Sequence, residues 1–142
     1  MINTLEQRKT AAAQLLRVKT EKMTTLELDL AMALLLQKTI CDDDTEGCPV
    51  KVLRDGVFVP FAPTSDWNDH GEVISNIQLV TGSHAEYEDD NDPERVTGHY
   101  YSCHGYYGGV KAVGIDLRRV VGRTCALLLE HAVQYSPEWG NS

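Results

Sequence analysis

The chain has few of the features that mark membrane, secreted or nucleic-acid-binding proteins. In its 142 residues no apolar run approaches the roughly 18 residues that a membrane span needs, and the first residues lack the apolar stretch of a secretory signal. Without a secretory signal its four cysteines are expected to be reduced thiols, and they form no C-x2-C pair that would indicate a structural zinc site. The 13 basic residues are outnumbered by 21 acidic ones, which disfavours general binding to nucleic acid. We therefore expect a cytosolic protein without a cofactor and without direct contact with membrane or nucleic acid.

Motifs for metal binding and catalysis are also missing. His99, Cys103 and His104 lie close together in the chain, but in a strand residue 104 points away from the face that 99 and 103 share. The same alternation separates the Cys103 thiol from the His104 imidazole, and no nucleophile elbow or phosphate-binding loop occurs. Cys125 is expected to be a small core residue. The sequence thus predicts neither a metal site nor an enzyme.

The composition and the first apolar patterns indicate one compact domain. Hydrophobic residues make up 42% of the chain and the net charge is −8. Residues 3–19 predict a helix whose thin apolar stripe is expected to pack on a neighbour or on a second copy, which suggests a homo-oligomer. From Thr24 a capping box begins a helix to about Lys38 that is apolar nearly all round and must be buried. We divide the chain into an N-terminal helical extension, residues 1–22, and a single α+β domain, residues 23–142.

Strand-like alternation follows the second helix. The apolar runs VKVL and VFVPF flank an Asp-Gly turn and predict a hairpin of residues 50–54 and 57–61. Residues 62–71, APTSDWNDHG, have no periodicity and are predicted to be a loop. Residues 76–81 alternate again and predict a third strand. The acid-rich residues 83–95 are expected to form a solvated loop, because like charges at this density repel one another.

A second hairpin and a final helix complete the predicted fold. The hairpin comprises residues 95–103 and 110–117 around a glycine-rich turn. The helix either begins after Asp116 and tolerates Gly122, or begins near Thr124. The second alternative is favoured, because a glycine within a helix costs about 1 kcal/mol relative to alanine. Together these elements predict an α+β fold with a mostly antiparallel sheet of about five strands, two N-terminal helices and one C-terminal helix.

The densest group of side chains suited to binding a ligand surrounds a tryptophan. Trp67 can stack on a planar ring while its neighbours hydrogen-bond to the edges of that ring. Those neighbours are Ser65, Asp66 and Asn68. If the final helix begins near Thr124, its free amides lie beside Arg119 and Arg123 and suit a phosphate or carboxylate. The alternatives are that Trp67 fills the core from the loop and that the arginines pair with the acidic loop.

Three stretches of the chain also carry a family likeness. They are MTTLELDLAMALLLQ from Met23, DGVFVPFAPTSDWNDHGEVISNIQLV, and GRTCALLLEHAVQY. They resemble the opening helix, the SDW loop with its two flanking strands, and the closing helix of the NinX-type accessory proteins of lambdoid phages, a domain of unknown function. The positions that match are Ser65, Asp66, Trp67 and Gly71 in the loop, and Gly122 and Thr124 in the closing helix. The resemblance implies a phage origin and expression in the host bacterial cytoplasm, without an established activity.

These observations lead to two main hypotheses of function. The first is a non-enzymatic phage accessory protein that binds and sequesters a phosphorylated, nucleotide-like ligand such as a defence signal. Its candidate binding residues are Ser65, Asp66, Trp67, Asn68, Arg119, Arg123 and Thr124. The second is an acidic protein inhibitor whose residues from Glu86 to Glu94 engage a basic patch on a host nuclease or DNA-binding defence factor. A nucleotide hydrolase is a third and less favoured alternative.

Overall fold

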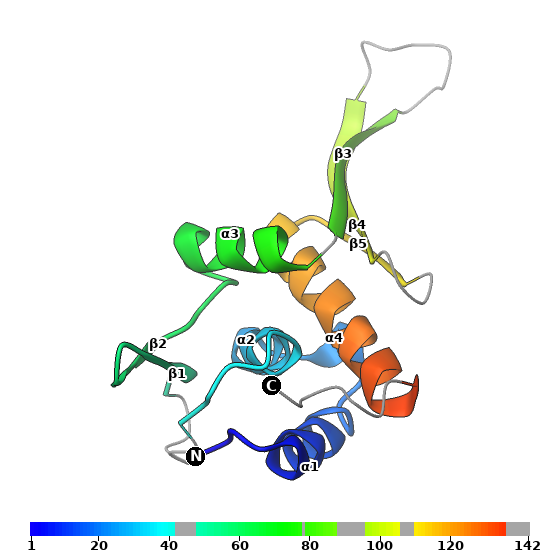
Figure 1. Ribbon diagram of the computed structural model, residues 1–142. Coiled ribbons are helices and arrows are strands. Elements are labelled where there is room, and N and C mark those ends of the chain that lie inside the picture. The colour runs from blue at the N-terminus through cyan, green and yellow to red at the C-terminus, as the bar shows by residue number, and fades with distance from the viewer. Residues whose placement is uncertain (42–47, 78, 88–95, 106–109, 136–142) are drawn as a thin grey trace.

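The computed structural model describes residues 1–41, 48–77, 79–87, 96–105 and 110–135 (Figure 1). Within these ranges the helices are α1 (Leu5–Leu15), the 3-10 helix η1 (Thr20–Lys22), α2 (Thr25–Leu35), α3 (Trp67–Asn76) and α4 (Leu117–Tyr135). The strands are β1 (Lys51–Arg54), β2 (Val57–Pro60), β3 (Leu79–Tyr87), β4 (Val96–Gly105) and β5 (Lys111–Gly114). The two N-terminal helices, the C-terminal helix and both hairpins are confirmed, as is the α+β class.

The core forms where α2 packs against α4, with α1 alongside (Figure 1). The predicted capping box starts α2: the Glu27 amide donates to the Thr24 hydroxyl at 3.2 Å, and the Thr24 amide donates to the Glu27 carboxylate at 3.0 Å. Leu28, Met32 and Leu34 are fully buried, which confirms that α2 is enclosed. The residues that α1 adds to this same core are Ala12 and Leu15.

The closing helix α4 is longer than the favoured prediction. It begins directly after Asp116, and Gly122 lies in its interior, so the prediction of a start near Thr124 is wrong. A Cβ at position 122 would lie 3.1 Å from Leu28 Cβ and 3.2 Å from Met32 Cε. Glycine therefore lets α2 and α4 approach closely, and burial of the two helices against each other outweighs the cost of about 1 kcal/mol for a glycine within a helix.

The predicted loop at residues 62–71 is also corrected, because α3 begins within it at Trp67. His70 and Val73 are buried and Ile77, directly after the helix, is half-buried. These three side chains have the spacing of one helix face. The pattern is weak in the sequence because most of the remaining positions hold small or polar residues, which are typical of turns.

The strands form two separate antiparallel sheets, not one sheet of about five strands. One sheet is the β1–β2 hairpin, in which Val52 pairs with Val59, and the other has the order β3–β4–β5. The first hairpin is extended on its other side by Ile40, which forms isolated bridges to Val52 and to Ile2. The connection from β2 to β3 runs through α3, and the first hairpin contacts that helix through the Arg54–Glu72 ion pair.

One face of the β3–β4–β5 sheet packs on α4. Cys103 in β4 is fully buried and His104 is exposed, which confirms that their side chains lie on opposite faces. Cys125 in α4 is a core residue as predicted, and burial raises the pKa of its thiol. The strand β3 continues to Tyr87, so the predicted acidic loop is strand over its first residues. The outer part of the β3–β4 hairpin extends beyond the helices (Figure 1).

Two predicted features fall outside the described residues. They are most of the acidic loop, residues 88–95, and the turn at residues 106–109. Within the described part of the chain, no helix combines the length and hydropathy needed to cross a membrane.

Candidate functional site

The local sequence places Trp67 at the exposed start of α3. The Asp66 Oδ1 atom accepts hydrogen bonds from the amides of Asn68 at 2.8 Å and Asp69 at 3.0 Å, and it thereby caps the helix. Trp67 is the first helical residue, and it is 61% exposed. The alternative in which Trp67 fills the core is therefore wrong.

Trp67 lies against the first turn of α4. The Arg118 Cζ atom lies 4.3 Å from the centroid of the Trp67 ring, so the guanidinium covers one face of the indole. Arg118 stands where α4 begins, and Asp116 caps that helix by accepting from the Arg118 amide at 3.1 Å. Side chains from the first turns of α3 and α4 therefore meet at the exposed indole. We call Trp67, His70, Asp116 and Arg118 the two-helix site.

His70 forms the buried floor of the two-helix site. Its ring meets Trp67 edge to face, with the centroids 5.2 Å apart and an angle of 86° between the planes. It is 6% exposed, and its Nδ1 atom has no hydrogen-bond partner among the described residues. Burial, followed by the positive charge of Arg118, lowers the pKa of His70. The imidazole is therefore neutral at neutral pH and can donate or accept one further hydrogen bond.

A buried and a half-buried carboxylate hold the turn that leads into α3. Asp29 of α2 accepts from the backbone amide and the hydroxyl of Thr64, both at 2.9 Å. Asp69 accepts from the Ala62 amide at 2.9 Å. Desolvation raises the pKa of Asp29 to about 6, although the hydrogen bonds from Thr64 act in the opposite direction. These contacts fix the turn immediately before the two-helix site.

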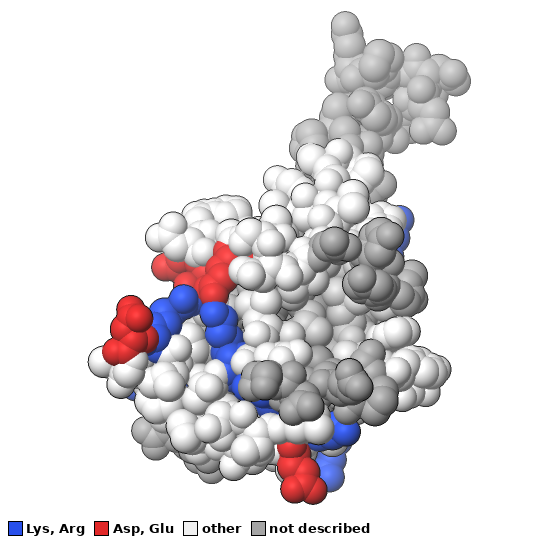
Figure 2. Space-filling model, in the orientation of Figure 1, with Lys and Arg blue, Asp and Glu red and all other residues white. Residues whose placement is uncertain are grey.

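An ion-pair cluster anchors α3 to the first hairpin and to the end of α2. Glu72 pairs with Lys38 and Arg54, and Arg54 also lies 3.7 Å from Asp69. Figure 2 shows basic side chains directly beside acidic ones on this side of the molecule. Burial acts to raise the pKa of Glu72, but the two cations outweigh it and hold that pKa below its ordinary value. The cluster fixes the face of α3 that points away from Trp67.

The predicted binding residues divide between different places. Ser65, Asp66 and Asn68 are exposed next to Trp67 in the chain. The structure does not bring the others to Trp67. Arg119 donates to the Met23 carbonyl at 3.3 Å, and Arg123 lines a hollow of about 210 Å³ together with Glu21 of η1 and Lys111 of β5.

Thr124 is the clearest departure from the predicted anion site. It is fully buried, and its hydroxyl lies 3.1 Å from the carbonyls of both Cys103 and Val120. Because it stands inside α4, its amide belongs to the helix and is not available to an anion. The free end of α4 lies at Asp116, so Arg118 occupies the place beside Trp67 that was predicted for Arg123.

A serine and a histidine meet on the exposed face of the second sheet. The Ser102 Oγ and His84 Nε2 atoms are 2.8 Å apart, which is a distance suited to a nucleophile and its base. Ser102 is only 4% exposed, so its hydroxyl offers a substrate little access. Among the described residues, no group of three or more histidine, cysteine or acidic side chains is arranged to hold a metal ion.

The sequence interpretation missed His70 and Arg118 as partners of Trp67. A signal for His70 was present in the sequence. If Asp66 caps a helix that begins at Trp67, then His70 stands three residues later and lies on the same face of that helix. The approach of Arg118 depends on how α3 and α4 pack, and nothing in the sequence encodes it locally. In comparisons with known proteins, no family model matches this chain, and no similar curated protein is found.

Proposed function

We propose that this chain is a non-enzymatic binding protein that sequesters a planar, anionic, nucleotide-like ligand at the two-helix site. The observation that carries the proposal is the exposed Trp67 indole, with the Arg118 guanidinium from the first turn of α4 against it. Exposed aromatic rings stack on bases, and arginine binds phosphate with a planar set of donors.

The exposed part of the indole is the surface on which the base would stack. Both capping bonds of Asp66 go to Oδ1, so Oδ2 can accept from an amino group on the edge of the base. Ser65 and Asn68 are exposed and can reach other edge atoms. Arg118 would hold the phosphate, the role first assigned to Arg119, Arg123 and the amides near Thr124.

The unpaired nitrogen of His70 supports a ligand at this place. Buried polar atoms nearly always have a hydrogen-bond partner, because leaving one unsatisfied costs about 1 to 3 kcal/mol. The Nδ1 atom of His70 has none among the described residues, and its ring touches Trp67. A polar ligand atom or a water molecule held with the ligand would satisfy it.

The biological setting remains part of the proposal and rests on the resemblance to phage accessory proteins. In that setting the protein acts in the cytoplasm of an infected bacterium and blunts a host defence by removing a nucleotide signal. Neither a cofactor nor catalysis is required for such a role, and self-association through the first helix would raise the number of binding sites in each particle.

Calorimetry with a panel of mononucleotides and cyclic dinucleotides tests the proposal. Stacking contributes about 1 to 3 kcal/mol per base, so Trp67→Ala should weaken binding by roughly ten- to a hundred-fold. Arg118→Gln should also weaken binding. The matched controls are Tyr135→Ala, an aromatic side chain that is 63% exposed at the other end of α4, and Arg17→Gln, an exposed arginine that follows α1. Absence of heat with every member of the panel, or equal losses in the controls, would refute the proposal.

A second candidate function is inhibition of a basic protein through the β3–β4 hairpin. The two strands run for nine and ten residues, and their outer part extends beyond the helices (Figure 1). The acidic residues from Glu86 to Glu94 belong to the end of β3 and to the segment that links it to β4. Neutralising these acids would abolish such inhibition and leave nucleotide binding intact. Binding of a basic partner should also weaken steeply with salt.

A further inference from the structure

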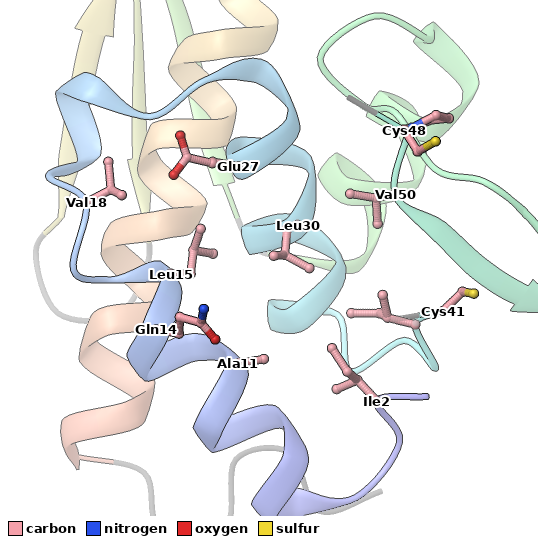
Figure 3. Close-up of a pocket in the computed structure, with 12 residues that line it drawn as sticks. Ile2, Ala11, Gln14, Leu15, Val18, Glu27, Leu30, Cys41, Cys48 and Val50 are labelled. Carbon is pink, nitrogen blue, oxygen red and sulfur yellow. The ribbon is translucent and has the colours of Figure 1, made fainter. Parts of the chain in front are cut away.

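A groove lies between α1, α2 and the segment that leads into β1, and its main hollow is largely apolar (Figure 3). Its main hollow has a volume of about 520 Å³. Leu15 and Val18 line it from the side of α1, Leu30 from α2, and Ile40 and Val50 from the segment before β1. A hollow of this size and lining is within the usual range for binding sites.

The groove continues along α1. A second hollow of about 490 Å³ shares Ile2, Ala11 and Gln14 with the first. Together the two hollows follow the 11 residues of α1, which at 1.5 Å per residue is roughly 16 Å. That length matches about three turns of a second helix laid alongside. The first hollow has the apolar lining that holds the apolar face of an amphipathic helix, whereas the second hollow is lined mostly by the polar side chains of Glu6, Gln7, Thr10 and Gln14.

Carboxylates outnumber cationic groups in the described lining, where the one positive group is the N-terminal ammonium of Met1 in the second hollow. Glu27 lines the first hollow and Glu6 lines the second, and no lysine or arginine lines either hollow among the described residues. An anionic amphiphile such as a fatty acid would meet the Glu27 carboxylate in the first hollow, with no described cation among the lining residues there, and Glu6 together with the Met1 ammonium in the second. A cationic amphiphile would be attracted electrostatically by Glu27 in the first hollow and by Glu6 in the second.

We propose that this groove binds a basic amphipathic helical segment of another protein. The apolar side chains of that segment would lie on Leu15, Leu30 and Val50, and its lysine or arginine side chains would reach Glu6 and Glu27. This interaction goes beyond the proposed nucleotide site and uses none of its residues. It is independent of the acidic hairpin as well.

The test uses the full chain and a fluorescein-labelled amphipathic helical peptide built from leucine and lysine. The comparison peptide has the same sequence with glutamate in place of each lysine. Fluorescence anisotropy should show that the lysine peptide binds at least ten-fold more tightly. Because the whole chain is acidic, general attraction must be separated from binding in the groove. Glu27→Gln removes one carboxylate from the lining of the groove. It leaves the start of α2 intact, since glutamine also completes a capping box.

The double variant Glu6→Gln with Glu27→Gln should weaken peptide binding several-fold. Its matched control is Glu21→Gln with Glu130→Gln, which removes two exposed acids that line neither hollow. Ala11→Phe places a large side chain in the groove and should weaken peptide binding more than the double variant does. This loss should persist at high salt, because it comes from lost apolar contact and not from lost charge. Equal losses in the double variant and in its control would show general charge attraction and overturn the proposal. So would equal binding of the two peptides, which would indicate a site for apolar ligands of any charge.

Discussion

Replacing Asp29 by asparagine should change how the stability of the protein depends on pH. Asp29 is 2% exposed, and one of its oxygens accepts both hydrogen bonds from Thr64. Asparagine has nearly the same shape and can keep that acceptor, but it cannot ionise. The comparison therefore isolates the cost of a buried negative charge next to the two-helix site.

The direction of the effect follows from proton linkage. The pKa of Asp29 rises from 3.8 to about 6 on folding, with desolvation as the main cause. Between these values the folded protein holds a proton that the unfolded chain has released, so the free energy of unfolding falls as pH rises. Above pH 6 the loss is complete, and a shift of this size corresponds to about 3 kcal/mol.

Urea unfolding at about pH 4 and about pH 7 measures this difference. Relative to the parent protein, Asp29→Asn should gain about 2 kcal/mol between about pH 4 and about pH 7, because Asp29 of the unfolded chain is already more than half ionised at the lower pH. Asp55→Asn, in the exposed turn between β1 and β2, is the control for the loss of one carboxylate. If the stability difference between parent and Asp29→Asn is the same at both pH values, the carboxylate titrates alike in the folded and unfolded states and the reasoning fails.

Two further predictions concern packing and charge around the same helices. Gly122→Ala should lower the free energy of unfolding by about 1 kcal/mol, because overpacking against α2 costs about 1 to 3 kcal/mol and the gain in helix propensity is about 1 kcal/mol. A variant more stable than the parent in urea would contradict this. Glu72→Gln should destabilise the protein by about 1 kcal/mol at neutral pH. Because its two cations hold the pKa of Glu72 below 4.5, this difference should shrink as pH falls through that lowered pKa, which acid titration of the unfolding midpoint would detect.

Features that depend on neighbouring residues were predictable from the sequence. The capping box at Thr24 and the apolar run after it determine α2 and its burial. The Asp-Gly turn also forms as expected, with φ of 50° at Asp55 and 80° at Gly56, because these residues tolerate the left-handed region. In both cases the hydrogen bonds and backbone preferences that decide the structure lie within a few residues of each other.

Features that depend on packing were not predictable in the same way. Gly122 weakens a helix when it is considered alone, yet it allows α4 to lie close to α2. The start of α3 requires Asp66 as a cap, and the turn before it is held by Asp29, which lies 35 residues from Thr64 in the sequence. Local propensity is worth only about 1 kcal/mol per residue, so contacts of this kind outweigh it.

The candidate site shows the same division. The sequence by itself determined that Trp67 stands among polar residues and that several arginines lie near the start of the last helix. Only the tertiary structure decided which arginine faces the indole. The helix α4 begins directly after Asp116 and not near Thr124 as predicted, and Arg118 in its first turn contacts Trp67. Successive residues point about 100° apart around a helix, so a shift in where the helix begins and how it packs exchanges one side chain for another.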